Sequence, residues 1–326
     1  MSNQPKLLDQ VSNSLRQKNY SYRTEKTYVG RIKRFILFHN KRHPNEMGEK
    51  EIGEYLTYLA VEKKVAPTTQ NQALNSIIYL YKHILKIDLG EINTLRPRSK
   101  KHLPVVLTPQ EAKRIITLLE GQYELMAKLL YGSGLRVSEV LRLRVKDVDF
   151  DQSQILVRDS KGNKDRVTML PQALQEPLRE HLIKIKILHD GDRRNNIEGV
   201  ELPYALSRKY AKAGKKWVWQ WVFPSANLSK DPRSGIIRRH HRFGSSLRKK
   251  IKAATMKAGI QKLVTPHTFR HSFATHLLEN NYDIRTVQEL LGHKSVKTTM
   301  VYTHVLNKGP SAVTSPLDMQ PKNGDS

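Results

Sequence analysis

The spacing of apolar residues is helical over most of the chain and strand-like between residues 145 and 170. In the first 95 residues, apolar side chains recur every three or four positions, as on one face of a helix. Examples are Tyr28, Ile32, Phe35 and Ile36, then Ile52, Tyr55, Leu56 and Leu59, then Leu74, Ile77, Ile78 and Tyr81. With a weaker helix near residues 5–18, this predicts a small domain of about four helices over residues 1–95.

A basic segment without apolar periodicity follows this domain. Residues 96–103 contain Pro97 and several Lys and Arg residues, so we interpret them as a linker. A new helix should start after Thr108, because Thr108 and Glu111 form a capping box around Pro109. The chain of 326 residues therefore predicts two domains, the second spanning residues 104–307. The polar tail, 308–326, should be poorly ordered alone.

The second domain is expected to carry a small antiparallel sheet. Short strands are indicated by three groups of residues: Val145, Val148 and Phe150; Ile155, Leu156 and Val157; and Val167, Thr168 and Met169. Lys161–Lys164, with glycine and asparagine inside, has hairpin-turn chemistry. The predicted fold class is thus mainly α with a small antiparallel β-sheet.

Net charge points to a polyanionic partner. The chain has 57 Lys and Arg against 30 Asp and Glu, a net charge of +27. The first 100 residues contribute +9 and the remainder +18, so both predicted domains are basic. Such a balance favours nucleic acid, because lysine and arginine that neutralise phosphates release bound counterions. A generally basic, soluble protein is the alternative that charge alone leaves open.

Composition also excludes some chemistry. There is no cysteine, which rules out disulfides, thiolate catalysis and cysteine-based metal sites. No stretch approaches the ~18 apolar residues of a membrane span, and the first ten residues lack a signal-peptide core. We expect a soluble, intracellular protein without membrane partners.

Three polar motifs stand out. In the first, glycines precede Arg136 and let the chain turn sharply to present the guanidinium at a helix start; Glu139 is its possible partner. In the second, His267 and Arg270 share a helix face. An arginine and a histidine aimed at one point suit a phosphate, because arginine binds two oxygens and histidine moves a proton near neutral pH.

The third motif pairs His293 with Tyr302, nine residues apart. A tyrosine near a helix end is most often a packing residue. Its hydroxyl, with a pKa near ~10, becomes a nucleophile only when cations and a base surround it. Each motif alone has such a structural explanation.

Taken together, the three motifs resemble the active-site signature of the tyrosine recombinase, or phage integrase-like, family over residues 5–307. The matching positions are Arg136, Lys161, His267, Arg270, His293 and Tyr302. Lys164 flanks the same turn as Lys161 and is the alternative for the lysine role. The resemblance implies a helical core-binding domain and an α+β catalytic domain that together form a C-shaped DNA clamp.

The resemblance also implies a role for each residue. Tyr302 attacks the scissile phosphorus and forms a 3′-phosphotyrosyl bond. Both arginines hold the non-bridging oxygens, Lys161 protonates the departing 5′-oxygen, His267 accepts the tyrosine proton and His293 hydrogen-bonds a phosphate oxygen. Glu139 supports the arginines from behind. No metal, ATP or other cofactor, and no small-molecule substrate, is implied.

A segment near residues 190–244 interrupts the helical pattern. It holds all three tryptophans, Trp217, Trp219 and Trp221, and the run from Arg238 to Arg242. Alternation predicts a strand with three indoles on one face. Core packing is the usual reading of such a cluster, but three indoles beside a basic run favour a platform for stacking bases.

This inserted segment, about 190–222, resembles that of integron integrases. The residues that carry the resemblance are Leu202–Leu206 within it and Arg239–His241 after it. The resemblance implies recombination of a duplex attI site with attC sites bound as folded single strands. It assigns extrahelical-base contacts to Trp219, His240 and His241, and less directly to Trp217, Trp221, Pro232 and Arg239. It further implies a tetrameric synapse with the tail, around Leu306–Leu317, packed on a neighbouring protomer.

Other functions remain open on the sequence. A recombinase of the Xer type or of a mobile element would act on duplex DNA only. A DNA-binding protein that no longer cuts, an RNA-binding protein and a type IB topoisomerase are further alternatives. Covalent attachment to DNA through tyrosine and preference for folded strands distinguish among them.

Overall fold

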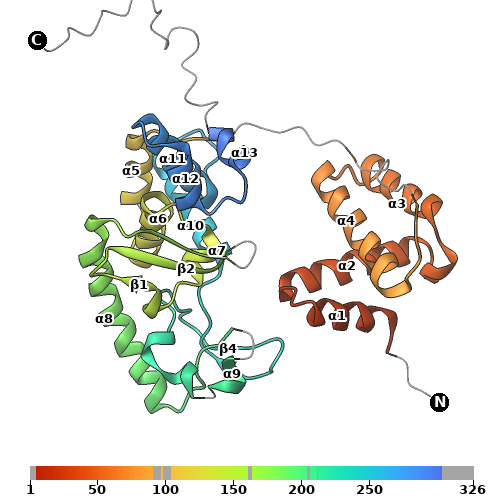
Figure 1. Cartoon of the computed structure of the whole chain (residues 1–326), viewed down its shortest axis with the longest axis horizontal. Coiled ribbons are helices and arrows are strands. Elements are labelled where there is room, and N and C mark those ends of the chain that lie inside the picture. Colours follow the sequence, from red (N-terminus) through yellow and green to blue (C-terminus); the bar gives the residue numbers. More distant parts are fainter. Residues whose placement is uncertain are drawn as a thin grey trace, which may run out of the picture. The chain divides into compact units, whose positions relative to one another are not determined.

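We describe residues 5–90, 97, 104–160, 164–203, 206–210 and 212–302 of a computed structural model. The chain divides into two compact units, Met1–His102 and Leu103–Ser326. Both are mainly helical, and the small sheets belong to the second (Figure 1). The expected fold class is therefore confirmed. Of the expected linker, 96–103, only Pro97 is among the described residues. The expected C-terminal tail, 308–326, lies outside them.

The N-terminal unit consists of four α-helices packed around an apolar core. The helices are α1 (Leu7–Gln17), α2 (Tyr22–Phe38), α3 (Glu49–Val61) and α4 (Pro67–Leu80), with a 3-10 turn η1 (Pro44–Glu46) and a π-helical turn η2 (Tyr81–Leu85). Phe35 and Tyr81 are fully buried there. The Tyr81 hydroxyl donates to the carbonyls of Pro44 and Met47 at 2.9 and 3.0 Å, so the buried phenol keeps hydrogen-bond partners.

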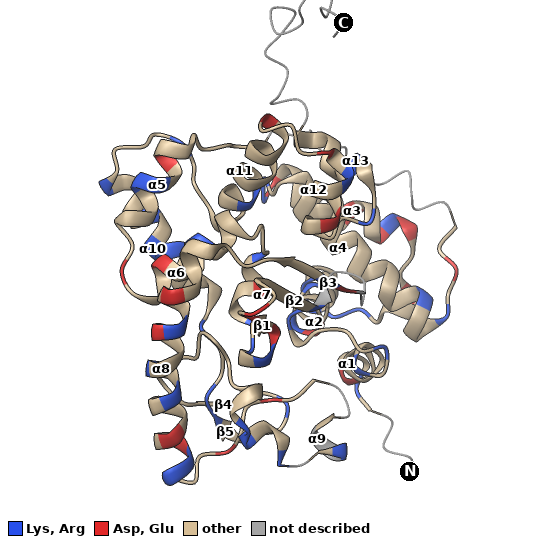
Figure 2. Cartoon of the chain, turned by 60° about the vertical axis from the view of Figure 1, so that its left-hand side comes forward, with Lys and Arg blue, Asp and Glu red and all other residues tan. Residues whose placement is uncertain are grey.

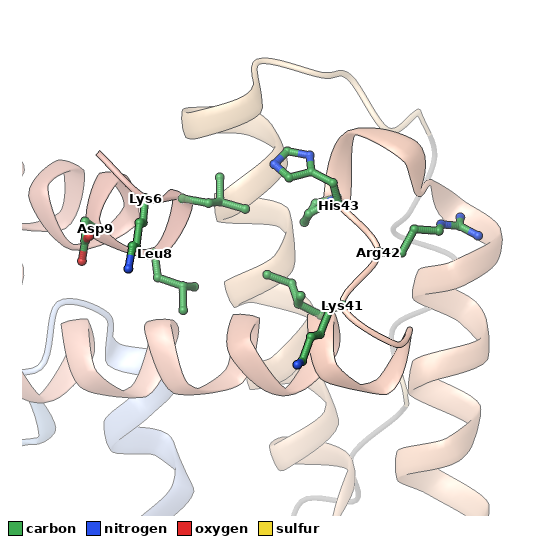
Figure 3. Close-up of a pocket in the computed structure, with 9 residues that line it drawn as sticks. Lys6, Leu8, Asp9, Lys41, Arg42 and His43 are labelled. Carbon is green, nitrogen blue, oxygen red and sulfur yellow. The ribbon is translucent and has the colours of Figure 1, made fainter. Parts of the chain in front are cut away.

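An apolar recess lies where α1 meets the loop after α2 (Figure 3). Leu7, Leu8 and Ile36 line it, and the basic residues Lys41 and Arg42 stand at its edge. This recess belongs to the N-terminal unit alone. The residues expected to carry chemistry all lie in the C-terminal unit.

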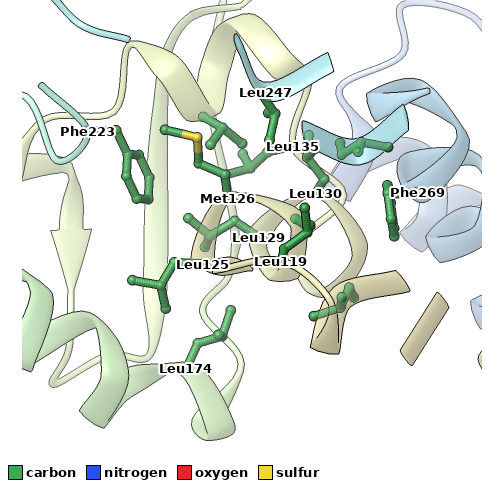
Figure 4. Packing of buried hydrophobic residues seen from close by; sticks show 14 of the residues in the cluster. Leu119, Leu125, Met126, Leu129, Leu130, Leu135, Leu174, Phe223, Leu247 and Phe269 are labelled. Carbon is green, nitrogen blue, oxygen red and sulfur yellow. The ribbon is translucent and has the colours of Figure 1, made fainter. Parts of the chain in front are cut away.

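The C-terminal unit is built around α6. Its α-helices are α5 (Pro109–Thr117), α6 (Gln122–Gly132), α7 (Val137–Leu141), α8 (Gln172–Arg194), α9 (Leu206–Lys209), α10 (Gly244–Lys257), α11 (Pro266–Glu279), α12 (Ile284–Leu291) and α13 (Val296–Thr299). Met126, Leu129 and Leu130 of α6 meet Leu247 and Phe269 from α10 and α11 in one core (Figure 4). Burial of such side chains contributes about 1.5–3 kcal/mol each.

The start of α5 has the predicted cap. The Thr108 hydroxyl accepts from the Glu111 amide at 3.1 Å, and the Glu111 carboxylate accepts from the Thr108 amide at 2.8 Å. Both bonds satisfy donors that a helix start otherwise leaves unpaired. The capping box therefore forms as the sequence predicts.

The three-stranded sheet has the order β1-β2-β3, all antiparallel. Its strands are β1 (Val148–Asp149), β2 (Gln154–Ser160) and β3 (Lys164–Met169). Val145 is not in a strand as expected, because residues Val145–Asp147 form the 3-10 turn η4. Leu156 pairs with Val167 and Ser160 with Lys164, so the hairpin turn falls where predicted.

Residues 195–243, between α8 and α10, form an irregular region that we call the aromatic segment. It contains α9, the 3-10 turns η5 (Ala213–Lys215) and η6 (Trp217–Trp219), and a hairpin of β4 (Ser229–Lys230) and β5 (Ile237–Arg238). The expected strand through three tryptophans is wrong: Trp217 and Trp219 lie in a 3-10 turn, and Trp221 alone forms a bridge, to Arg144. Tyr204 lies outside the described residues.

Basic residues recur along α8 beside this segment (Figure 2). The basic residues of the chain thus lie on regular helices as well as in loops. None of the helices within the described part of the chain is long and apolar enough to cross a membrane.

Candidate active site

A sharp turn before α7 positions Arg136. Gly134 adopts φ +61°, and a Cβ there would lie 2.4 Å from the ring of Phe273, so both conformation and space require glycine. Arg136 then caps α7. Its amide donates to Glu139 Oε2 at 2.7 Å, its Nη1 to Oε1 at 2.6 Å and its Nη2 to the carbonyl of Gly292 at 3.1 Å. The ion pair with Glu139 anticipated from the spacing is present.

Glu139 is shared by a second arginine that the sequence analysis missed. Arg166 donates through Nη1 and Nη2 to the two carboxylate oxygens at 2.9 and 2.7 Å, and its Nε donates to the Leu290 carbonyl at 2.9 Å. Strand alternation was the available signal, because the flanking Val167 is exposed while the Arg166 side chain is 8% exposed. Arg166 therefore connects the sheet to the last turn of α12.

The charge of Glu139 is strongly stabilised. Burial by itself would raise its pKa, but the hydrogen bonds and positive charges of Arg166 and Arg136 outweigh burial and lower the pKa to about 2. Arg270 Nη1 lies 3.9 Å from the same carboxylate. One ionised glutamate thus orders three arginines, two of which are the expected phosphate ligands.

Arg270 lies on α11 with its guanidinium almost completely enclosed. Nη1 donates to the Gly134 carbonyl, and Nη2 donates to the Leu291 carbonyl at 2.6 Å and to His293 Nε2 at 3.2 Å. Burial, with the charge of Arg136, lowers the pKa of Arg270 to about 9. Arg270 remains protonated at neutral pH and forms the centre of the site.

His293 lies in the turn after α12 and uses both ring nitrogens. Since Nε2 accepts from Arg270, Nδ1 carries the hydrogen and donates to the Thr299 hydroxyl at 3.0 Å. Burial and the charges of Arg270 and Arg136 lower its pKa to about 3. His293 is therefore a neutral imidazole at physiological pH.

Tyr302 ends the 3-10 turn η7 (Met300–Tyr302) and is only 3% exposed. Its ring lies nearly parallel to that of His293, with centroids 6.2 Å apart. Burial raises the pKa of its hydroxyl, although the charges of Arg270 and Arg136 act in the opposite direction. The side chains of Arg136, Arg270, His293 and Tyr302 therefore lie close together.

His267 forms no hydrogen bond with the Tyr302 hydroxyl among the described residues. It is exposed on the first turn of α11, and the hydroxyl instead forms a 3.0 Å hydrogen bond with His271 Nδ1, one turn further along. The ring centres of His267 and His271 are 6.5 Å apart. The sequence analysis did not identify His271, because it considered only the i, i+3 pair of His267 and Arg270. His271 follows His267 at i+4, on the same face of the helix.

The lysine expected to take part in catalysis is Lys161, with Lys164 as its alternative. Lys161 is outside the described residues, and Lys164 pairs through its backbone with Ser160 at the start of β3. Within the described ranges, no three His, Asp or Glu side chains gather as metal ligands. The site assembled from described residues thus comprises arginines, histidines and one tyrosine around one carboxylate.

Trp219, in the aromatic segment, rests on two cations. Lys146 Nζ lies 3.2 Å from the centre of its ring, and the Arg144 guanidinium carbon lies 5.3 Å away. Arg144 is 7% exposed and donates to the carbonyls of Trp219 and Glu201, each at 2.7 Å. Burial lowers the pKa of Arg144 to about 10. The indole is therefore held in place by contacts with its ring and its backbone.

The other two tryptophans differ from Trp219. Trp221 is 5% exposed and packs on the Arg144 guanidinium at 3.8 Å and on His241 at 5.3 Å, so the inner face of the segment holds it. Trp217 makes an edge contact with His189 at 5.6 Å. The three indoles do not form a single face, and Trp219 is the one beside two cations.

Arg239 is buried in an ion pair. Its Nε and Nη2 donate to the two Asp192 oxygens at 2.6 and 2.7 Å, and Nη1 donates to the Ser225 carbonyl at 2.9 Å. These bonds occupy the guanidinium, so Arg239 braces the aromatic segment against α8 instead of facing outward as expected for a base contact.

Its neighbours His240, His241 and Pro232 lie in or beside the β4–β5 hairpin. His241 Nδ1 donates to the Arg242 carbonyl at 2.7 Å, and burial lowers the pKa of His241. His240 Nε2 is buried without a hydrogen-bond partner among the described residues. Pro232 is exposed in the turn. A buried ring nitrogen without a partner is costly unless a bound group supplies one.

Comparison with known proteins gives matches to both units. Residues 105–308 match the family model described as the phage integrase family, and residues 7–91 match the model of the phage integrase N-terminal SAM-like domain. An "Integrase/recombinase" of Escherichia coli is 50% identical over 317 residues, which is 97% of this chain and 94% of that protein. Tyrosine recombinase XerA of Thermococcus onnurineus is 33% identical, covering 83% and 84%.

Solved structures have the same fold. XerH site-specific recombinase bound to palindromic difH substrate gives a TM-score of 0.60 at 20% identity, covering 94% of this chain and 88% of that one. A lambda integrase dimer bound to a COC′ core site gives 0.60 at 18%, covering 91% and 93%. At these identities the likeness concerns the fold alone.

Proposed function

Because this chain belongs to the phage integrase family of tyrosine recombinases, enzymes that cleave and rejoin DNA at specific sites, we propose that it is an integron integrase. In this role it recombines attI with attC sites that are bound as folded single strands. The observation that carries the proposal is Trp219, an indole placed outside the catalytic core and supported by Lys146 and Arg144. Duplex recognition alone does not require such a platform.

The proposed chemistry starts from the arginines. Arg136 and Arg270 bind the non-bridging oxygens of the scissile phosphate and stabilise the charge that grows on them in the transition state. The ionised Glu139 contacts both guanidinium groups, and Arg166 donates a hydrogen bond to the same carboxylate. Because catalysis depends on donors that are fixed in advance, this ordered cluster supports the proposal.

Tyr302 then attacks phosphorus and forms a 3′-phosphotyrosyl ester, while the 5′-oxygen leaves as a hydroxyl. Lys161, or Lys164 beside it, donates the proton to the 5′-oxygen. His293, neutral with Nδ1 protonated in the DNA-free chain, hydrogen-bonds a phosphate oxygen after exchanging its contact with Arg270. His267 is exposed on the first turn of α11 and reaches the phosphate from that side. The ester conserves the bond energy, so rejoining needs no ATP.

The aromatic segment supplies the proposed recognition of folded strands. Lys146 lies over the ring of Trp219, and a flipped base stacks on the ring face opposite to Lys146. Base–aromatic stacking contributes about 1–3 kcal/mol per base. His240 and the exposed Pro232 complete the contact. Arg239, His241, Trp217 and Trp221 act by holding the segment in shape, since their described contacts are with the protein itself.

We further propose the wider assembly that this function needs. The N-terminal unit and the C-terminal unit contact one DNA site from two sides as a clamp, four protomers form the synapse in the bacterial cytoplasm, and the tail packs on a neighbour. The net charge of +27, shared between both units, supports contact of each unit with DNA.

The test combines covalent trapping with two forms of DNA. The protein is incubated with end-labelled attC, as a duplex and as a single strand that folds into an imperfect hairpin, then denatured and examined for protein-linked label. We expect label on the folded strand, and none with Tyr302→Phe. Label that persists in Tyr302→Phe would contradict the proposed nucleophile.

Trp219→Ala tests the platform, with Val218→Ala as the matched control because Val218 is its exposed neighbour. We expect Trp219→Ala to weaken folded-strand binding by about 5- to 150-fold, the equivalent of about 1–3 kcal/mol, and to leave duplex attI binding unchanged. Equal losses on both forms of DNA would favour the duplex-only alternative, which the similarity to Tyrosine recombinase XerA supports.

A further inference from the structure

The contact between His271 and the Tyr302 hydroxyl has no role in the proposed function. Oη and Nδ1 are 3.0 Å apart, within normal hydrogen-bond distance, and the ring centres are 5.5 Å apart. Tyr302 is 3% exposed, so its hydroxyl has little water to bond instead. The nucleophilic oxygen is therefore paired with a titratable nitrogen before DNA binds.

The protonation states of the two side chains determine which of them donates this hydrogen bond. Burial, followed by the charges of His267 and Arg270, lowers the pKa of His271 to about 4, so the imidazole is neutral at physiological pH. The pKa of the Tyr302 hydroxyl is raised, so the phenol keeps its proton. With the imidazole hydrogen on Nε2, the phenol O–H donates to Nδ1.

Binding of DNA changes the electrostatics in the useful sense. Arg270 disfavours a positive charge on His271, and both Arg270 and Arg136 disfavour one on His293. A phosphodiester between these arginines adds a negative charge and offsets that repulsion, which raises the proton affinity of His271. The same arginines favour the phenolate form of Tyr302.

We propose that His271 is a catalytic residue that accepts the proton of Tyr302 during strand cleavage. The Tyr302 O–H bond breaks and its proton moves to His271 Nδ1 while Oη forms the bond to phosphorus. The bond between phosphorus and the 5′-oxygen breaks, and that oxygen takes a proton from the separate acid on the β2–β3 hairpin. In rejoining, each proton returns to its source, so the cycle consumes no reagent.

The hydrogen bonds of His271 differ from those of His267, which lies on the same face of α11. His267 is exposed, and no hydrogen bond joins it to Tyr302 in the described part of the chain. His293 is close to the Tyr302 ring, but its Nε2 and Nδ1 are engaged with Arg270 and Thr299. Of the three histidines around the nucleophile, His271 alone has a nitrogen directed to the reacting oxygen.

The experiment measures formation of the covalent protein–DNA complex in single turnover. The substrate is a labelled site nicked just beyond the cleavage position, so that the 5′-hydroxyl fragment leaves and the complex accumulates. Any site that the unmodified protein cleaves serves, whether duplex or folded, so the result does not depend on the proposed integron function.

Two variants separate proton acceptance from positioning. His271→Ala removes the imidazole, and His271→Asn keeps a hydrogen-bonding atom near the Nδ1 position without a group that titrates. We expect both to form the complex at least about 100-fold more slowly, the usual contribution of general acid–base catalysis. Added imidazole should accelerate His271→Ala and have no effect on the double variant His271→Ala with Tyr302→Phe.

Controls exclude a folding defect. DNA affinity and thermal unfolding are measured for each variant, and His43→Ala in the N-terminal unit controls for histidine loss and for added imidazole. A rate within about threefold of the unmodified protein in His271→Ala, or in His271→Asn, would overturn proton acceptance. Failure of imidazole to accelerate a folded His271→Ala protein that binds DNA would overturn it as well.

Discussion

The catalytic centre and the aromatic segment both depend on buried arginines, but they use them differently. In the centre, Arg136, Arg166 and Arg270 converge on one carboxylate, Glu139. Arg166 lies in strand β3, Arg270 lies in helix α11, and Arg136 caps the start of α7. The aromatic segment is held by Arg239 within it and by Arg144 outside it, and each binds backbone carbonyls of irregular chain in the segment. Arginine orders charges in the first region and replaces secondary structure in the second.

This difference teaches where each region is vulnerable. The centre combines several like charges, so its weak point is the single anion that compensates them. The segment has few regular hydrogen bonds, so its weak points are the side chains that satisfy its carbonyls. A change in the first should affect charge and chemistry together, whereas a change in the second should affect recognition before chemistry.

The largest expected effect comes from Glu139→Ala. Loss of the carboxylate leaves three neighbouring arginines uncompensated, and breaking a buried ion pair in this way typically costs about 3–5 kcal/mol. We expect that decrease in the free energy of unfolding, measured by denaturant titration, and loss of covalent complex with DNA. Glu124→Ala is the matched control, because its half-exposed pair with Lys128 should contribute only about 0–1 kcal/mol.

Acid should break the centre next. The pKa values of His271 and His293 are lowered to about 4 and about 3 in the folded chain, so the unfolded chain takes up protons first as pH falls. Stability should therefore be fully present above about pH 6.5 and fall below it, by up to about 1.4 kcal/mol per pH unit for each histidine.

Thermal unfolding of His293→Asn between pH 7 and pH 4 checks this expectation. The variant should lose less stability on acidification than the unmodified protein does. His241 in the aromatic segment also has a lowered pKa and contributes in the same direction, so some dependence on pH remains. An unchanged slope in His293→Asn would show that His293 does not contribute to the acid sensitivity of the protein.

Arg144→Ala should break the aromatic segment and spare the centre. Two backbone carbonyls, of Trp219 and Glu201, lose their donor, and each buried group left without a partner costs about 1–3 kcal/mol. We expect folded-strand binding to weaken by at least about tenfold, measured by gel shift, with cleavage of duplex attI retained. Arg142→Ala, an exposed neighbour, serves as the stability control. Loss of duplex cleavage would mean that the two regions are coupled.

The smallest effect is expected for Lys146→Met, which keeps the length of the side chain and removes the charge over the Trp219 ring. A cation–π contact at a partly exposed site contributes about 0.5–1 kcal/mol. Folded-strand affinity should therefore fall only by about two- to fivefold. A loss as large as that of Arg144→Ala would show that Lys146 contacts DNA directly.

The sequence by itself determined the helical unit, the capped start of α5, the hairpin and the turn before Arg136. These features depend on local causes. Apolar spacing selects a buried helix face, a capping box satisfies its own amides, and glycine permits the turn before Arg136. Such causes act within a few residues, so they can be read without knowing the rest of the fold.

Only the tertiary structure decided the partners of individual side chains. Arg166 meets Glu139 across 27 positions, and Arg239 is held by Asp192 across 47, so no local pattern connects them. His271 rather than His267 contacts Tyr302 because η7 packs near the second turn of α11. Trp217 and Trp219 lie in a 3-10 turn, and Arg144 binds the carbonyl of Trp219 from a distant part of the sequence. Periodicity identifies the buried face of an element, whereas packing between distant elements selects which atoms meet on it.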